Sequence, residues 1–177
     1  MVGPFINAGG LAIGAILGAS CSKLISQNLK EKMPLTFGLA SMAMGITMIV
    51  KVKLLPAAIL ALLLGTIIGE LVHLEAGIGK VAGLTRGIVD KVIKPRESGM
   101  SQEEFSGKFV AILVLFAASG TGIFGAMNEG MTGDMTMLLA KAFLDFFTAA
   151  IFATGMGYSV VVLAIPLLFV QGALFYA

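Results

Sequence analysis

Long apolar runs alternate with short polar segments along this chain, and the lengths of the runs lead to the first prediction. Six runs can be drawn, at residues 5–22, 35–50, 54–72, 107–127, 136–154 and 158–177. Each has close to the roughly 20 residues that a helix needs to cross the hydrocarbon core of a bilayer. Because backbone groups in lipid must be hydrogen-bonded within the segment, each run is predicted to be a helix. We therefore expect an all-α, polytopic transmembrane bundle of about six spans.

Composition narrows the class of protein. Hydrophobic residues make up 58% of the chain and charged residues 12%, whereas a soluble domain has about 45–50% and about 25%. A single transmembrane domain over residues 1–177 is therefore predicted, with three spans (1–74), a surface segment and linker (75–106) and three further spans (107–177). One cysteine and one histidine cannot form a His/Cys metal cluster, so no metal and no cofactor are expected.

The basic residues predict how the chain lies in the membrane. Residues 75–94 place apolar side chains on one side of a helical wheel and basic ones elsewhere, which is typical of an amphipathic helix on an anionic membrane surface. With six spans, the loops on one side carry nine basic residues and those on the other only Lys51 and Lys53. The positive-inside rule then predicts an external amino terminus and a cytoplasmic basic loop, with Glu129 and Asp134 outside.

Two halves of three spans would lie in opposite orientations, as the inverted repeats of many transporters do. The sequence support is a short similarity between IGAI at 13–16 and FGAM at 124–127, which lie in the opening span of each half. An inverted 3+3 repeat is therefore a hypothesis.

Glycines at four-residue spacing indicate where helices pack. Gly10, Gly14 and Gly18 form a column on the first predicted span, and Gly65 and Gly69 repeat the spacing on the third. A column of small residues lets a neighbouring helix approach closely in the membrane. We interpret these five glycines as helix contacts.

The run at 136–154 carries two ionisable residues that hydrocarbon disfavours. Lys141 and Asp145 are four residues apart and so project from the same side of a helix. Each costs roughly 2.5–3.5 kcal/mol at the centre of a membrane helix, so both are expected to face a protein interior or a watery cavity. Two roles stay open: a structural ion pair, or a site at which Lys141 holds an anion or Asp145 holds a cation or proton.

A second polar feature interrupts the run at 107–127, where Ser119, Gly120, Thr121 and Gly122 follow one another. With Gly125 they also match GxGxxG, but a dinucleotide site needs a preceding strand, so we reject that interpretation. A broken helix is favoured, because its free backbone groups could meet a polar ligand near the bilayer midplane. A kink or close-packing point without a ligand is the alternative.

Two amide side chains lie in other apolar runs. Asn7 is near the start of the first span, and Gln171 follows Pro166 in the last. Both are candidate ligands of the same polar site, and a hydrogen bond to a neighbouring helix is the alternative for each.

These features resemble a known family. The opening with Asn7 and the glycine column, together with residues 63–75, 109–157 and 164–174, is similar to the bacterial membrane family of unknown function DUF554. The resemblance implies a multi-pass inner-membrane protein, but it supplies no substrate and no catalytic residue. Members usually continue with another hydrophobic region, so a pore that needs that region would take it from another subunit.

The sequence therefore predicts an inner-membrane transporter for an ion or small polar solute, with residues 119–122 facing Lys141 and Asp145. A channel, or a non-transporting structural or regulatory subunit, is the alternative. No enzyme is expected, because scattered serines and His73 at a helix end do not make a nucleophile and base. The basic residues flank the membrane, so no nucleic acid is expected. The expected partners are the lipid bilayer, a small ion or solute, and further copies in a homo-oligomer.

Overall fold

A computed structural model of the chain describes residues 1–50, 52–73 and 101–177, and the regular elements in these ranges are helices. The all-α prediction is confirmed for this part of the chain. The predicted surface helix at 75–94 and the neighbouring linker to residue 100 lie outside the described residues. The elements in order are α1 (Val2–Ser20), α2 (Gln27–Val50), α3 (Leu55–Leu71), α5 (Gln102–Ala117), α6 (Gly120–Thr132), α7 (Thr136–Met156), the 3₁₀ helix η1 (Gly157–Leu163) and α8 (Ala164–Tyr176).

Within the described ranges, four helical stretches are long and apolar enough to cross a membrane. α3 is apolar as well, but has 17 residues. The stretches agree with a multi-pass membrane protein, while the count of six crossings and the inverted repeat stay predictions. The four stretches are Val2–Ser20, Gln27–Val50, Glu103–Thr132 and Thr136–Tyr176.

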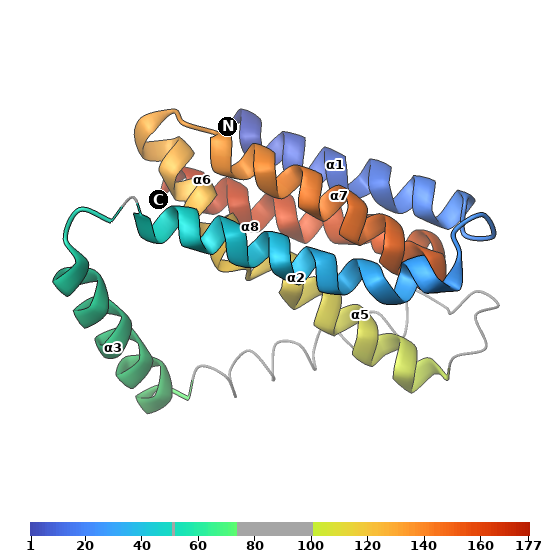
Figure 1. Cartoon of the computed structure of the whole chain (residues 1–177), viewed down its shortest axis with the longest axis horizontal. Coiled ribbons are helices and arrows are strands. Elements are labelled where there is room, and N and C mark those ends of the chain that lie inside the picture. Colours follow the sequence, from blue (N-terminus) through green and yellow to red (C-terminus); the bar gives the residue numbers. More distant parts are fainter. Residues whose placement is uncertain (51, 74–100) are drawn as a thin grey trace.

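The closest packing in the bundle joins α1 to α7, which lie side by side (Figure 1). A Cβ atom on Gly14 or Gly18 would overlap a backbone carbonyl oxygen of α7, so only glycine allows this approach. The contacts advance in the same order along both helices, so α1 and α7 run in the same direction. They pair Gly10 with Ala142, Gly14 with Phe146 and Gly18 with Ala150.

The chain reverses at η1, and α8 returns antiparallel to α1. Asn7 bonds to Gln171 near one end of the bundle, whereas Ser20 bonds to Tyr158 near the other. α6 packs against α8, and a Cβ on Gly130 would overlap the carbonyl oxygen of Phe175. Both chain termini lie at the end of the bundle where α6 meets α7 (Figure 1).

Capping residues explain where α5 and α6 begin and end. The Ser101 hydroxyl accepts a hydrogen bond from the Glu104 amide at 3.2 Å, as an N-cap does for an unpaired helical N–H. α6 ends at Thr132 and is capped by Gly133, whose φ of 76° is left-handed and whose N–H bonds to the Glu129 carbonyl. Glycine adopts this conformation without a Cβ clash.

α2 begins earlier than the sequence suggested. The second apolar run was drawn from residue 35, but α2 begins at Gln27 and Pro34 lies inside it. The lysines in this first part of the helix made it look like a loop. A proline there removes the N–H that would bond to the Lys30 carbonyl, which favours a bend at this point.

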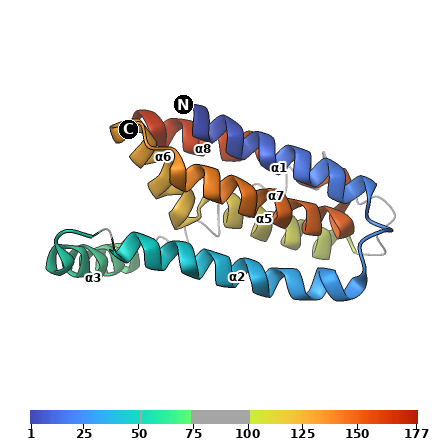
Figure 2. The same cartoon turned by 45° about the horizontal axis from the view of Figure 1, so that its top comes forward.

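α2 and α3 are held less tightly than the rest of the fold. Neither helix has a buried residue. Figure 2 shows α2 along one side of the bundle and α3 extending away from it. Their exposed side chains are largely apolar, as expected for surfaces that face lipid or another membrane helix.

Candidate functional site

Lys141 and Asp145 form an ion pair on the inner face of α7. The Lys141 Nζ donates to both carboxylate oxygens of Asp145, at 2.8 and 2.6 Å. The two side chains are only 3% and 5% exposed, so both lie within the protein. Their one-turn separation on α7 brings them together, as the four-residue spacing in the sequence implies.

The break predicted in the fourth apolar run lies beside this pair. α5 ends at Ala117, α6 begins at Gly120, and Ser119 caps the new helix by accepting a hydrogen bond from the Gly122 amide at 3.2 Å. A helix that begins inside the bundle directs unpaired N–H groups and the positive end of its dipole into the protein.

Gly122 allows the polar groups to converge at this break. A Cβ atom on Gly122 would lie 2.7 Å from the Lys141 Cε and 3.0 Å from both the Gln171 Nε2 and the Ser119 Oγ. All three atoms therefore surround one point in the first turn of α6. A larger residue at position 122 would displace at least one of them.

Asn7 and Gln171 extend the polar cluster to α1 and α8. The Asn7 Nδ2 donates to the Gln171 Oε1 at 3.2 Å, and the Asn7 side chain also lies close to the Asp145 carboxylate. Both amides are buried, with 0% and 1% exposure. The Asn7 Oδ1 and the Gln171 Nε2 have no hydrogen-bond partner among the described residues.

A groove of about 330 Å³ reaches the ion pair from one side. Its inner wall includes Ser119, Thr121, Lys141 and Asp145, and α2 provides the opposite wall. The helix break, through Ser119 and Thr121, and the ion pair therefore line the same groove. Six polar residues line it: Ser41, Ser119, Thr121, Lys141, Asp145 and Thr148.

A second space of about 500 Å³ continues from this groove toward the start of α2. The two spaces share Pro34, Leu115 and Phe152 as lining residues. Lys30 and Lys108 lie at the far end of the second space. These two adjacent spaces between α2 and the α5–α7 side, called the route below, have lysines at one end and the buried ion pair at the other.

The other predicted site residues take different positions. Gly120 lies at the break, and a Cβ there would meet open space. Asn7 and Gln171 lie behind the ion pair and do not line the groove, and half-buried Pro166 does not line it either. Gly65 has open space around it, so helix packing at Gly65 and Gly69 stays a prediction.

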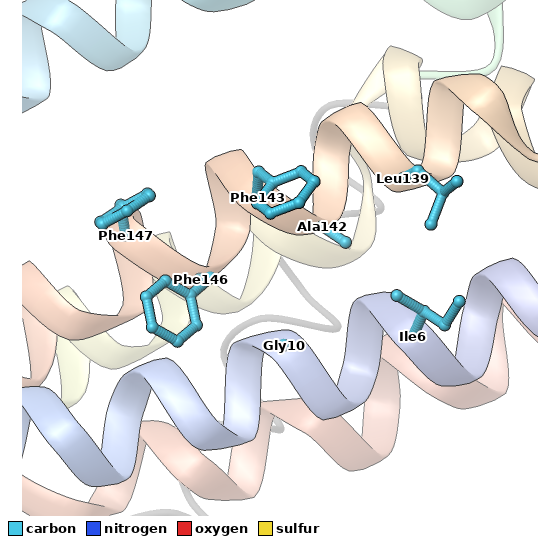
Figure 3. Close-up of a pocket in the computed structure, with 7 residues that line it drawn as sticks. All are labelled: Ile6, Gly10, Leu139, Ala142, Phe143, Phe146 and Phe147. Atoms are coloured by element: carbon cyan, nitrogen blue, oxygen red, sulfur yellow. The ribbon is translucent and has the colours of Figure 1, made fainter.

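Figure 3 shows a further pocket, of about 270 Å³, between α1 and α7. Apolar residues line it throughout, with Phe143, Phe146 and Phe147 from α7 and Ile6 from α1. Its walls offer a polar solute no hydrogen bond, so this pocket is not part of the candidate site. In the described ranges, no three His, Cys, Asp or Glu side chains gather in a way that could hold a metal ion.

The match to a family model covers residues 2–177, and the model's description is a protein of unknown function (DUF554). The chain belongs to the DUF554 family. No solved structure matches it.

Two curated relatives of this DUF554 chain are bacterial. The uncharacterized protein YqgA of Escherichia coli is 47% identical over 177 residues, which is all of this chain and 74% of the relative. The uncharacterized membrane protein YdfK of Bacillus subtilis is 26% identical over 181 residues, covering 99% of this chain and 72% of the relative. The DUF554 chain is accordingly a multi-pass membrane protein with bacterial relatives.

Two parts of the polar interior of this DUF554 chain escaped the sequence reasoning. Thr148 lines the groove seven residues after Lys141, so a search for polar residues at helical spacing would have found it. Glu129 is 5% exposed and accepts hydrogen bonds from the Val2 and Gly3 amides at 2.8–3.1 Å. Nothing in its local sequence indicated that it would cap the amino end of α1.

Proposed function

We propose that this DUF554 chain is an inner-membrane transporter for an ion or a small polar solute, which binds in the groove between α2 and α7. The observation that carries the proposal is the buried Lys141–Asp145 pair, which borders an open groove beside a broken helix. A buried ion pair is poor support for stability, because apolar residues of similar volume often serve as well or better. Its position at the end of a groove is better explained by contact with a hydrophilic solute.

The predicted topology gives the route a direction. Lys30 and Lys108 line the end of the route that is remote from the ion pair, and the positive-inside rule predicts that this end is cytoplasmic. The amino terminus would then be external. The route would connect the cytoplasm with a site inside the membrane, and passage to the other side would make the protein a channel or, with alternating closure, a transporter.

A structural role has its own support. The ion pair, Asn7 and Gln171 link α7, α1 and α8 through one set of polar contacts, and such contacts can specify how membrane helices pack. α2 and α3 bury no residue within the described fold, which supports the prediction of a homo-oligomer in which another copy covers them.

Liposome swelling distinguishes the two functions without knowledge of the solute. The purified chain is reconstituted, and swelling is followed in iso-osmotic sodium formate, potassium chloride and glycerol. The double variant Lys141→Met/Asp145→Asn removes both charges together, so no unpaired ion is left inside the fold. Glu70→Gln, which neutralises an exposed carboxylate on α3, is the matched control.

Transport predicts swelling with the wild type and Glu70→Gln in at least one solute, and swelling reduced at least tenfold in the double variant. The double variant must retain its wild-type elution volume in size-exclusion chromatography. If the wild type causes no swelling and Asp145→Asn alone disrupts assembly, the transport proposal is wrong and the structural role stands.

A further inference from the structure

The orientation of two buried amides determines which hydrogen-bonding groups stay available near the ion pair. The Asn7 Nδ2 donates to the Gln171 Oε1, and the Asn7 side chain also lies close to the Asp145 carboxylate. Turning the Asn7 amide over would place its oxygen against the carboxylate, so the charge of Asp145 determines the orientation of Asn7. Asn7 in turn holds the Gln171 oxygen, and the unpartnered group of Gln171 is therefore its Nε2 donor.

The free donor of Gln171 lies among other donors. Lys141 has three N–H groups, and its hydrogen bonds within the described residues go to the two oxygens of Asp145. The Ser119 Oγ accepts from Gly122, so its own hydrogen is left to donate. The Lys141 Cε, the Gln171 Nε2 and the Ser119 Oγ all lie within 3.0 Å of the point that a Cβ on Gly122 would occupy.

The electrostatics of the site favour negative charge. Asp145 already neutralises Lys141, so a net positive potential has to come from other groups. The first turn of the 13-residue helix α6 lies against the cluster at Gly122, and a helix amino end carries roughly half a positive charge. Lys30 and Lys108 line the other end of the route, where Glu104 pairs with Lys108 at 2.8 Å and Lys30 adds positive charge.

We infer that the site takes a small oxyanion, either a carboxylate or an inorganic oxyanion, which enters from the groove, places one oxygen on Lys141 and reaches the Gln171 Nε2 behind the ion pair with another. The inference rests on the proposed transport function, because it names the substrate class of the same site. An oxyanion matches donors that lie side by side at a helix amino end. A metal cation would meet an ammonium group and amide hydrogens. The Asn7 Oδ1, which also has no partner, suits an oxyanion that carries a proton.

The test is thermal unfolding of the full chain in detergent with sodium formate, sodium nitrate and sodium phosphate. Ionic strength is held constant with sodium chloride. At ten times the half-saturating concentration, binding should raise the unfolding temperature by about 3–6 °C. Gly122→Ala and Gln171→Leu should each raise the half-saturating concentration of the oxyanion at least tenfold. Gly45→Ala, whose Cβ meets open space on α2, should leave it unchanged.

Gly122→Ala is expected to fold, because the atoms that its Cβ would meet are ends of movable side chains. The inference is supported if an oxyanion stabilises the wild type in a saturable way and if both variants need a higher concentration of it. Two results overturn the inference: no effect of any oxyanion on the wild type beyond that of sodium chloride, or an equal effect in all variants. Oxyanion binding without liposome swelling would refute the transport function and leave the oxyanion site in place. Swelling without an effect of oxyanions on stability would refute the oxyanion site and leave the transport function in place.

Discussion

Removing the charge of Asp145 should destabilise the protein far more than removing both charges of the pair. The Lys141 Nζ and the Asp145 Oδ2 are 2.6 Å apart. At an effective dielectric constant of about 20, their attraction is about 6 kcal/mol. The desolvation of two ions costs several kcal/mol each, so the pair contributes little net stability. Asp145→Asn removes the attraction but keeps the cost of burying the ammonium group.

The expected loss for Asp145→Asn is about 3–5 kcal/mol, which is the range for breaking a buried ion pair. In a domain of this size, that loss lowers the unfolding temperature by about 6–20 °C. Lys141→Met alone should cost a similar amount, since it leaves the carboxylate buried without its cation. In Lys141→Met/Asp145→Asn no unpaired ion remains, so most of the stability should return.

The assay is loss of helical circular dichroism on heating in detergent, for the wild type, both single variants and the double variant. The coupling energy from this double-mutant cycle should exceed about 2 kcal/mol. The reasoning is refuted if Asp145→Asn unfolds within 2 °C of the wild type, or if the double variant is less stable than either single variant. The first result would mean that water reaches the pair and screens it.

Three further outcomes follow from the packing of the helix ends and of the α1–α7 contact. Gly14→Ala places a methyl group against the Phe146 carbonyl and should lower the free energy of unfolding by at least about 1–3 kcal/mol. Gly9→Ala has open space around it, so it should leave that free energy unchanged or raise it by up to about 1 kcal/mol. Both effects are measured as changes in the unfolding temperature. Glu129→Gln should increase amide hydrogen exchange at the start of α1, because a charged acceptor of backbone N–H bonds is lost; unchanged exchange there would contradict the capping role. Ser101→Ala should cost about 0.5–2 kcal/mol and speed exchange in the first turn of α5, and an effect confined to other helices would count against the cap.

The polar residues in apolar runs were the parts of the site that the sequence predicted best. Lys141 and Asp145 are too costly in lipid to face it, and the structure buries both. The polar and glycine residues from Ser119 predicted an interruption, and the structure has one there, because α5 ends at Ala117 and α6 begins at Gly120. Both predictions rest on local chemistry, since neither needs knowledge of which helices are neighbours.

Relations between helices were harder to predict. The spacing of Gly10, Gly14 and Gly18 indicated a packing face, but an apolar sequence does not show which helix lies against it. The hydrogen bond between Asn7 and Gln171 spans 164 residues of chain, and no local pattern pairs them. α2 was placed too late because the lysines before Pro34 resemble a loop, although a helix end can carry lysines where it leaves the membrane.

The helix that closes the groove is also one of the two that are held least. α7 is fixed to α1 by glycine contacts in which the backbones almost touch, so moving α7 would separate a close-packed surface. α2 forms the opposite wall through Pro34, Phe37, Gly38 and Ser41 and buries none of them. A change in the width of the groove therefore costs least when α2 moves, and Pro34 lies at the level where its two spaces join. The buried charges lie on the rigid wall of the groove, and the helix that can move forms the opposite wall. Binding and release of a solute require such a fixed site beside a movable element.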